Sequence, residues 1–420
     1  MAEPRVRIAF LTSEFITEAN FAGGLAQHLG RVTRGLAERG HRVEVFVTAE
    51  TCETMEDRGV IIRRVKLKKW LPLRSTNLML RVIRKRPLCK LQLAYSTALG
   101  LDRALRRQAS TAGFDIVQAT SWLGTGYFAA ANPWAPVVVR ASSFEPLLFP
   151  YRGQRLSLDD TMYWRFEVAA MRRAAAVFSP SRFLAKEIRR ITGVQSHVVN
   201  PPCGDAESTA RQQAGDDPLG DWSDFMIYFG KVAKYKGAGL LAEAVSRVLA
   251  QGHPLRLAVA GPVEDDPEAR RLLSLAETRP ASVRYLGSLN HEALMGVVER
   301  ARCVVLPSLM DNLPNTCLEA MAMRKVVVGP NGVSFDELIR DGESGLLFRM
   351  GDPVSLRQAI VEAWDMSGER RRAMGHAAET RIRRMAPDIA LRELERFYEG
   401  VIDNAGPSNG GRRPARRALE

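Results

Sequence analysis

The chain has 420 residues, of which 46% are hydrophobic and 25% are charged. This composition is that of an ordinary globular protein, and the length exceeds what one typical hydrophobic core organises. No run approaches the roughly 18 apolar residues that a membrane span needs, and the opening MAEPRVRIAFLT is typical of a first strand and not of a signal peptide. We therefore expect a cytoplasmic protein with two domains.

The cysteines and histidines indicate neither a disulfide framework nor a metal site. The five cysteines are odd in number, scattered and without a CxxC pair, so we expect reduced thiols. The six histidines are equally dispersed, and none has the spacing of a HxxxH motif. We expect no bound metal.

The first half of the chain alternates strand and helix patterns, which predicts a doubly wound α/β domain. A strand, a helix ended by Gly40 and a second strand are predicted at residues 5–12, 25–39 and 43–48. Further strands are predicted at residues 115–119, 136–141, 176–179 and 197–200. A helix opened by a proline and a serine is predicted at residues 180–188.

A glycine pair, Gly23 and Gly24, lies between the first predicted strand and the first predicted helix. Glycine lets the backbone come close to a ligand at the start of a helix, where free N–H groups favour an anion. Many turns use glycine only for its backbone freedom. The position after the first strand favours a ligand loop.

The second half repeats the same alternation. Strands are predicted at residues 225–229, 255–260, 283–286, 303–306 and 326–328, and helices at residues 239–249, 267–277 and 292–301. Asp352-Pro353 starts another predicted helix. We divide the chain into a first domain at 1–203, a linker at 204–224, a second domain at 225–387, a terminal helix at 388–403 and a flexible basic tail at 404–420.

The most informative stretch is DNLPNTCLEAMAMRKVVVGPNGVSFDELIRDGESGLLF, residues 311–348. Pro314 cannot lie inside a helix and Asn315 or Thr316 can cap one, so a helix is predicted to begin near Thr316 and to carry Glu319 in its first turn. Ser334 and Glu337 form a capping-box pattern for a later helix. Because buried strands flank the loop, we expect a ligand site at the carboxyl edge of a parallel sheet.

This stretch resembles the donor-site signature of glycosyltransferase family 4, whose members are retaining enzymes with the GT-B fold. Asp311 and Glu319 keep the spacing of two acidic residues separated by seven others, between a strand ending VVLPS and the segment DELIRDGESGLLF. The family pattern usually has Glu at the first position, where this chain has Asp311. The resemblance implies two doubly wound Rossmann-like domains facing across a cleft. It gives the acceptor to the first domain and the donor to the second, with the terminal helix crossing back to the first.

The resemblance also implies roles for individual residues. Lys231 and Lys236 match the basic pair, commonly Arg then Lys, that acts on the donor diphosphate, and with Asp311 they form the expected catalytic set. Glu319 is expected to accept hydrogen bonds from the donor ribose. The expected donor-binding residues are Gly23, Gly24, Gly261, Leu286, Asn312, Leu313, Pro314, Asn315, Thr316 and Glu319.

One departure from the family pattern concerns a histidine that often follows a first-domain strand. Here the corresponding strand ends RASSFEP and offers Ser142, Ser143 and Glu145 as candidates for contact with the sugar or the acceptor. No catalytic base is assigned, because in retaining chemistry of this kind the departing phosphate can itself take the acceptor proton.

A basic stretch runs from Arg58 to Gly100, with twelve Lys or Arg and no acidic residue. At helical spacing, apolar and basic side chains separate onto two faces, which is typical of an interfacial helix. The residues of this expected membrane patch are Trp70, Leu78, Arg81, Val82, Arg84 and Lys85. An anionic membrane surface, a polyanionic acceptor and a helix that packs on its own domain remain open. Nucleic acid ranks below them because no nucleic-acid-binding module accompanies the stretch.

We therefore expect a metal-independent, retaining glycosyltransferase of the hexosyltransferase type, with no cofactor other than a nucleotide-diphosphate sugar, by default a UDP-sugar. The acceptor is expected to be a sugar or lipid-linked hydroxyl compound, or a precursor of a glycan or secondary metabolite. The expected location is the cytoplasm, including the inner membrane face. The alternatives are a sugar-nucleotide epimerase or phosphorylase on the same fold, and a catalytically degenerate scaffold that binds a membrane or a partner.

Overall fold

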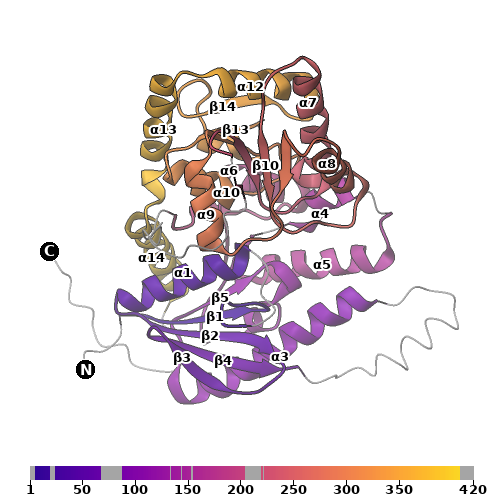
Figure 1. Cartoon of the computed structure of the whole chain (residues 1–420). Coiled ribbons are helices and arrows are strands. Elements are labelled where there is room, and N and C mark those ends of the chain that lie inside the picture. Colours follow the sequence, from indigo (N-terminus) through magenta and orange to yellow (C-terminus); the bar gives the residue numbers. More distant parts are fainter. Residues whose placement is uncertain are drawn as a thin grey trace, which may run out of the picture. The chain divides into compact units, whose positions relative to one another are not determined.

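The computed structural model describes residues 5–18, 24–67, 88–132, 134–142, 144–152, 155–203, 219–220 and 222–406. The chain divides into two compact units (Figure 1). The first comprises residues 1–146, 154–202 and 388–420, and the second comprises residues 147–153 and 203–387. Each unit is built on its own sheet, parallel in the second unit and parallel except for one edge hairpin in the first, which shows the predicted pair of Rossmann-like α/β domains.

Among the described residues of the first unit, eight strands form one sheet in the order β3-β4-β2-β1-β5-β6-β7-β8. The central strands are buried runs of branched side chains, as expected for strands covered on both faces. The strands are β1 (Arg7–Thr12), β2 (Arg42–Ala49), β3 (Thr54–Asp57), β4 (Val60–Lys66), β5 (Ile116–Thr120), β6 (Val137–Arg140), β7 (Ala176–Ser179) and β8 (His197–Val198).

Strands β3 and β4 form an antiparallel hairpin that was not predicted. Its turn is Arg58-Gly59, where both residues have positive φ, 46° and 78°. Two positive φ values belong to the tight turns that match the twist of a hairpin. The start of the predicted basic stretch is therefore the turn and second strand of this hairpin.

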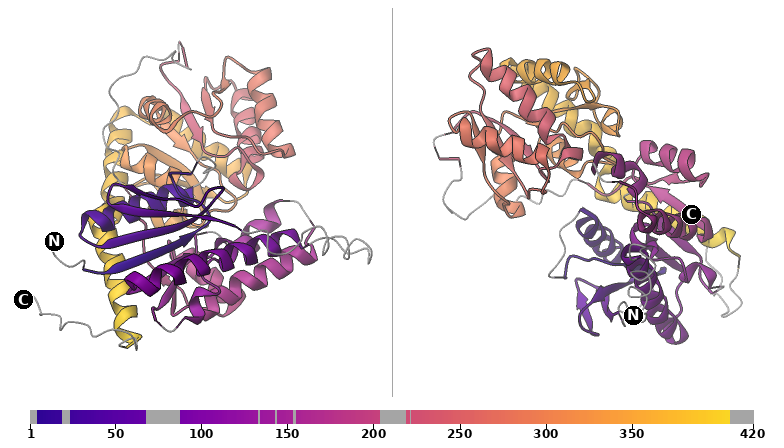
Figure 2. Two further views of the ribbon diagram at one scale, coloured as in Figure 1. Left: turned by 90° about the horizontal axis from the view of Figure 1, so that it is seen from below. Right: turned by 90° about the vertical axis from the view of Figure 1, so that its right-hand side faces the viewer.

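The helices of the first unit pack on both faces of its sheet. They are α1 (Gly24–Glu38), α3 (Cys89–Ala112), α5 (Leu158–Arg173), α6 (Arg182–Thr192) and α14 (Pro387–Asn404). The short helix α4 (Glu145–Leu148) spans the division between the units, which falls after residue 146. Helix α14 enters the first unit at Asp388. Apolar residues of α1 and α14 share one buried cluster with β1, β2 and β6, and Figure 2 shows α14 in yellow.

Polar contacts also fix α14 on the first unit. Arg39 donates two hydrogen bonds of 2.8 Å to the Glu395 carboxylate, and His41 Nε2 lies 2.9 Å from the same group. Further along the helix, the buried Tyr398 hydroxyl donates to the Gln118 side-chain carbonyl on β5. A bidentate pair of this kind is stronger than an ordinary surface ion pair because two bonds share one geometry.

In the second unit, six described strands form a parallel sheet in the order β11-β10-β9-β12-β13-β14. The strands are β9 (Met226–Phe229), β10 (Leu257–Ala260), β11 (Val283–Tyr285), β12 (Cys303–Val305), β13 (Val326–Asn331) and β14 (Leu346–Arg349). The helices are α7 (Ala238–Ala250), α8 (Pro267–Thr278), α9 (His291–Arg300), α10 (Asn315–Ala322), α11 (Phe335–Leu338), α12 (Pro353–Asp365) and α13 (Gly368–Ile382). Helices α7, α8 and α12 cover apolar strand residues in one buried cluster.

Candidate functional site

The strand order of the second unit creates a switch point at the carboxyl edge of its sheet. Strand β9 lies in the middle, with β10 on one side and β12 on the other. In open α/β sheets, ligands bind at the carboxyl edge where the strand order reverses. The segments after β9 and β12 therefore frame the candidate site.

Two predicted catalytic residues, Lys236 and Asp311, meet at this switch point. Lys236 ends a short 3₁₀ turn after β9 (Lys234–Lys236), and Asp311 follows β12. The Lys236 Nζ lies 2.5 Å from Asp311 Oδ2, and the two side chains are 25% and 11% exposed. The Tyr235 carbonyl also accepts from the N–H groups of Leu309 and Met310, at 2.8 and 3.1 Å. Side-chain and backbone bonds thus hold the two segments together across the switch point.

Lys231, the other predicted basic residue, has a different partner. Its Nζ lies 3.1 Å from Glu264 Oε1, and the two side chains are 43% and 40% exposed. Glu264, which follows β10, was not singled out from the sequence. An exposed pair of this kind contributes little to stability, so the Lys231 side chain is able to exchange Glu264 for an anionic ligand.

Glycines bring three backbone segments close together at the same edge. Gly230 and Gly261 follow β9 and β10 with φ of 120° and 134°. A Cβ on Gly261 would lie 2.0 Å from the Gly230 carbonyl oxygen, and a Cβ on Gly230 would lie 3.4 Å from Thr316 Cγ2. The Tyr285 hydroxyl, at the end of β11, donates to the Gly261 carbonyl at 2.9 Å. The predicted residue Leu286 follows at this edge, half-buried.

The start of helix α10 differs from the prediction. Pro314 is the N-cap residue and no side chain caps the helix, so neither Asn315 nor Thr316 acts as the cap. The Pro314 carbonyl accepts from the N–H groups of Cys317 and Leu318, at 3.0 and 3.2 Å. Because the helix begins at Asn315, Glu319 lies in its second turn and not in its first. Without a capping side chain, the first N–H groups are disposed to bind an anion or a hydroxyl oxygen.

The predicted capping box at Ser334 and Glu337 is wrong. Ser334 has a left-handed backbone, with φ of 72°, and its side chain makes no cap bond. An N-cap residue needs an extended backbone to turn its oxygen onto the helix. The Ser334 hydroxyl instead donates to the Asp311 carbonyl at 3.4 Å, and this contact helps to position the loop that bears Asp311.

The remaining half-buried residues of the loop are Asn312 and Leu313, which lead into the buried Pro314. The first unit holds the other predicted residues. Gly24 is the exposed first residue of α1, whereas Gly23 lies outside the described residues.

The predicted acceptor candidates follow strand β6. The Ser142 hydroxyl accepts a hydrogen bond from Arg140, Glu145 opens helix α4 as a buried residue, and Ser143 lies outside the described residues. Glu145 faces a second acidic residue, Glu167 on α5. Burial, reinforced by the charge of Glu145 and opposed by a hydrogen bond from Tyr163, raises the pKa of Glu167 to about 8.

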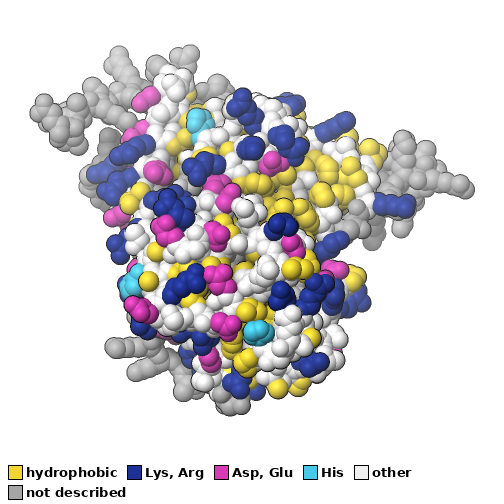
Figure 3. All heavy atoms as spheres, turned by 90° about the horizontal axis from the view of Figure 1, so that it is seen from above, with side chains coloured by type: hydrophobic (Ala, Val, Ile, Leu, Met, Phe, Trp, Pro, Cys, Tyr) yellow, Lys and Arg dark blue, Asp and Glu magenta, His cyan; other side chains and the backbone are white. Residues whose placement is uncertain are grey.

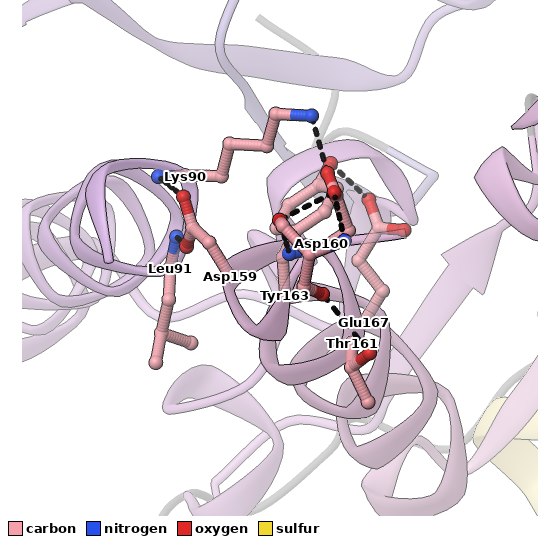
Figure 4. Close-up of polar contacts among 8 residues, drawn as sticks. Lys90, Leu91, Asp159, Asp160, Thr161, Tyr163 and Glu167 are labelled. Atoms are coloured by element: carbon pink, nitrogen blue, oxygen red, sulfur yellow. Dashed lines mark hydrogen bonds and ion pairs between the residues drawn. The ribbon is translucent and has the colours of Figure 1, made fainter. Parts of the chain in front are cut away.

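Figure 4 shows the polar network on α5 that contains Glu167. The Tyr163 hydroxyl donates to Glu167 Oε1 at 2.5 Å, and Lys90 Nζ on α3 lies 2.5 Å from Asp160 Oδ1. The Asp159 carboxylate accepts from the Lys90 backbone N–H at 2.8 Å and so holds the start of α3. Lys90, the last basic residue of the predicted basic stretch, thus has acidic partners of its own.

Other described members of the basic stretch are also paired. Arg63 lies 2.7 Å from the fully buried Glu44, and Arg64 lies 3.1 Å from Glu18. A run without acidic residues in the sequence is therefore partly neutralised by Glu44, Glu18 and Asp160, which come from other parts of the chain. Figure 3, which views the molecule from above, shows basic and acidic side chains interspersed on the face that it displays. The predicted membrane patch lies outside the described residues: Trp70, Leu78, Arg81, Val82, Arg84 and Lys85.

Within the described part of the chain, His, Cys, Asp and Glu side chains form no group of three that could hold a metal ion. The same residues include no helix that is both long and apolar enough to cross a membrane. All five cysteines are free, and Cys203, Cys303 and Cys317 are buried.

Two family models match the chain. The model described as Glycosyltransferase Family 4 matches residues 22–204, and the model described as Glycosyl transferases group 1 matches residues 224–366. The second match contains all of the switch-point residues described above.

Curated relatives are identical to the chain at about a quarter of the aligned positions. The alpha-D-kanosaminyltransferase of Streptomyces kanamyceticus is 24% identical over 240 residues, which cover 55% of this chain and 62% of the relative, less than two thirds of its length. The D-inositol 3-phosphate glycosyltransferase of Geodermatophilus obscurus is 25% identical over 370 residues, which cover 81% of this chain and 78% of the relative.

Solved structures share the fold. Sucrose-phosphate synthase from Thermosynechococcus elongatus superposes with a TM-score of 0.75 at 17% identity, covering 95% of this chain and 100% of that chain. HepE of Anabaena, solved in complex with UDP and glucose, superposes with a TM-score of 0.67 at 15% identity, covering 94% of this chain and 100% of that chain.

Proposed function

The chain belongs to glycosyltransferase family 4 and has the GT-B fold, and we propose that it moves a sugar from a nucleotide-diphosphate sugar to a hydroxyl group of an acceptor, with retention of the anomeric configuration. The observation that carries this proposal is the contact of Lys236 with Asp311 beside the uncapped start of α10. Cation, carboxylate and free N–H groups converge there, at the switch point of a parallel sheet.

In the proposed reaction, negative charge develops on the diphosphate as the bond between the anomeric carbon and the phosphate oxygen breaks. Lys236, Lys231 and the first N–H groups of α10 stabilise this charge. The acceptor oxygen bonds to the anomeric carbon from the same face, and its proton passes to the departing phosphate oxygen. Asp311 orients Lys236 and a sugar hydroxyl. Glu319 accepts hydrogen bonds from the ribose hydroxyls.

Metal independence is part of the proposal, because protein groups supply the positive charge that the diphosphate needs. Lys231 exchanges its exposed partner Glu264 for a phosphate oxygen when the donor binds, whereas Lys236 keeps Asp311 and donates to another phosphate oxygen. The N–H groups at Asn315 and Thr316 add the positive end of the α10 dipole.

The names and titles of the relatives support a choice of donor and acceptor classes to propose. UDP is the first nucleotide to test, because HepE was solved with UDP and glucose. The relative from Geodermatophilus obscurus is named for D-inositol 3-phosphate. We therefore propose a polyhydroxylated ring, a cyclitol or a sugar, as the acceptor, with a lipid-linked form as a variant of the same chemistry.

Donor consumption with and without acceptor tests the proposal against its rivals. The transferase should consume UDP-sugar efficiently only when myo-inositol 3-phosphate or another cyclitol or sugar is added, and activity should survive excess chelator. NMR should show the donor's anomeric configuration in the product. Isomerised donor without acceptor would identify an epimerase, consumption dependent on inorganic phosphate would identify a phosphorylase, and intact donor under every condition would indicate a scaffold.

A membrane surface remains our proposed second partner. Leu93 on α3 and Leu158 at the start of α5 are 52% and 57% exposed, and Lys90 ties the beginnings of these two helices together. Exposed apolar side chains beside basic ones suit an anionic bilayer, where each basic residue contributes on the order of 1 kcal/mol. The chain should cosediment with anionic vesicles more than with neutral ones, and less at high salt. The double substitution Leu93→Ser and Leu158→Ser should reduce this binding, whereas equal pelleting with both vesicle types would contradict it.

A further inference from the structure

A buried arginine in the first unit has a neutral hydroxyl, and not a carboxylate, as its partner among the described residues. Arg140 is the last residue of β6 and is only 6% exposed. Its guanidinium donates a hydrogen bond to the Ser142 hydroxyl, and no Asp or Glu of the described residues forms an ion pair with it. A buried charge is unfavourable unless an opposite charge or a set of hydrogen bonds compensates it. One neutral hydroxyl compensates this charge poorly.

Other arginines of the same unit have a carboxylate partner that compensates their charge. Arg39 makes a bidentate pair with Glu395 at 2.8 Å. Arg63, which lies on β4, donates to the buried carboxylate of Glu44 at 2.7 Å. Both are more exposed than Arg140, yet both have a carboxylate partner. The arrangement of Arg140 is therefore the one that a bound anion would complete.

Two uncharged polar side chains, Tyr398 and Gln118, form a hydrogen-bonded pair next to Arg140. Tyr398 of α14 lies beside Arg140 and donates to the carbonyl of Gln118, the residue that pairs with Val138 in the register of β5 and β6. The Gln118 side-chain amide nitrogen is buried and has no acceptor in the described part of the protein. A buried amide without an acceptor is unusual and points to a missing partner.

Helix α1 contributes His28 to the same region. Burial, together with the positive charges of Arg140 and Arg31, lowers the pKa of His28 well below its usual value. His28 is therefore neutral, and it presents imidazole to a cationic neighbour. An anion bound beside Arg140 would compensate the buried charge of the guanidinium. It would also offset the positive potential that this charge creates at His28.

The position of Arg140 at the carboxyl edge of the first sheet also favours ligand binding. Arg140 ends β6 at the carboxyl edge of a parallel sheet, and α1 begins at Gly24 after β1, with no acidic residue in its first turn. Free N–H groups at the start of a helix and an unpaired guanidinium are complementary to phosphate and carboxylate groups.

We propose that Arg140, together with Gln118 and the first turns of α1, binds an anionic group of the acceptor, a phosphate monoester or a carboxylate. This inference rests on the proposed transferase function, because it assigns the first unit to the acceptor. The donor diphosphate has its own cations, Lys231 and Lys236, in the second unit. The enzyme should therefore select phosphorylated or carboxylated acceptors over neutral ones.

Calorimetry on the full-length chain tests the site without requiring turnover. The probes are inorganic phosphate, myo-inositol 3-phosphate, myo-inositol and UDP. Both phosphate compounds should bind more tightly than myo-inositol, and Arg140→Gln should weaken their binding at least tenfold while UDP affinity changes less than twofold. Arg140→Lys should fall between, because lysine keeps the charge but loses the planar fork. Arg63→Lys is the matched control and should bind all four probes as the wild type does.

The outcomes separate this inference from the proposed function. Unchanged phosphate binding by Arg140→Gln would overturn the inference even if UDP-sugar is consumed. Competition of inorganic phosphate with UDP, lost in Lys236→Ala, would place the anion in the second unit and would also overturn it. Loss of phosphate binding in Arg140→Gln, in a chain that binds no nucleotide, would leave the anion site standing and refute the transferase function.

A second measurement keeps the inference testable if Arg140→Gln does not fold. Addition of inorganic phosphate to the wild-type chain should shift the NMR signals of the His28 ring. The ring signals of His41, which is paired with Glu395 in the same unit, should not move. Equal shifts of both rings, or no shift of either, would contradict the site.

Discussion

Replacement of Lys236 by alanine should lower kcat about a hundredfold, with a much smaller effect on folding. Lys236 is three-quarters buried and lies 2.5 Å from Asp311, at the point where the departing diphosphate is proposed to gain charge. Removal of one preorganised group that stabilises developing charge typically costs about 10²–10³ in kcat. Steady-state kinetics with saturating donor and acceptor measure this loss directly.

Two variants control for the Lys236 result. Lys236→Arg should recover part of the activity, because the charge is kept. Lys186→Ala changes an exposed lysine on α6 in the other unit and should leave kcat unchanged. A Lys236→Ala enzyme that is folded, as judged by circular dichroism, and as active as the wild type would refute the proposed role. A strict requirement for added magnesium or manganese would equally refute metal-independent charge stabilisation.

Replacement of Glu319 by alanine should weaken nucleotide binding about ten- to a hundredfold. The half-buried Glu319 lies in the second turn of α10, the helix whose Thr316 side chain lies next to Gly230. Loss of hydrogen bonds to an ionised carboxylate costs about 1.5–3 kcal/mol. Calorimetric titration with UDP gives the affinity, and thermal unfolding in the absence of nucleotide checks that the fold is intact.

The matched control for Glu319 is Glu292→Ala, which removes an exposed acid from the first turn of α9 in the same unit. It should bind UDP as the wild type does. Glu319→Gln keeps the shape and one carbonyl acceptor, so it should lose less affinity than Glu319→Ala. Equal UDP affinity for Glu319→Ala and the wild type would show that this carboxylate does not hold the ribose.

Strands β9 to β13 of the second unit could be predicted from the sequence because most of them are buried runs of apolar residues, whereas strand β14 and helix α13 were not predicted. A run such as residues 326–328, all valine, can only be a covered strand between its turn residues, and the helices between such runs have clear apolar periodicity. Proline and aspartate at the starts of α8 and α12 also fix these helices locally, since Asp266 and Asp352 cap them.

The first unit was predicted less completely. Helix α3 was not predicted, although its buried Ala94, Ala98, Leu101 and Leu105 recur at helical spacing. Helix α5 was missed although Ser157 and Asp160 form a genuine capping box at its start. The same motif at Ser334 and Glu337 does not form a capping box, because the Ser334 backbone is left-handed. The backbone conformation of one residue depends on tertiary packing, which a four-residue motif does not specify.

The residues of the candidate site could be named from the sequence, but their pairing could not. Lys236 and Asp311 are 75 positions apart, and their contact depends on β9 lying between β10 and β12. Chain order does not reveal which strand is central. The same reason applies to Glu44 on β2, whose buried carboxylate neutralises Arg63 on the adjacent strand β4, in a stretch that looks purely basic in sequence.

Hydrogen–deuterium exchange with and without UDP most directly tests the claim that the carboxyl edge of the second sheet is the donor site. Saturating UDP should slow exchange in the segment from Lys231 to Gly237 and at the start of α10, while β14 and α12 of the same unit should exchange as before. Protection confined to the first unit, or no protection at a UDP concentration that calorimetry shows to be saturating, would contradict the account.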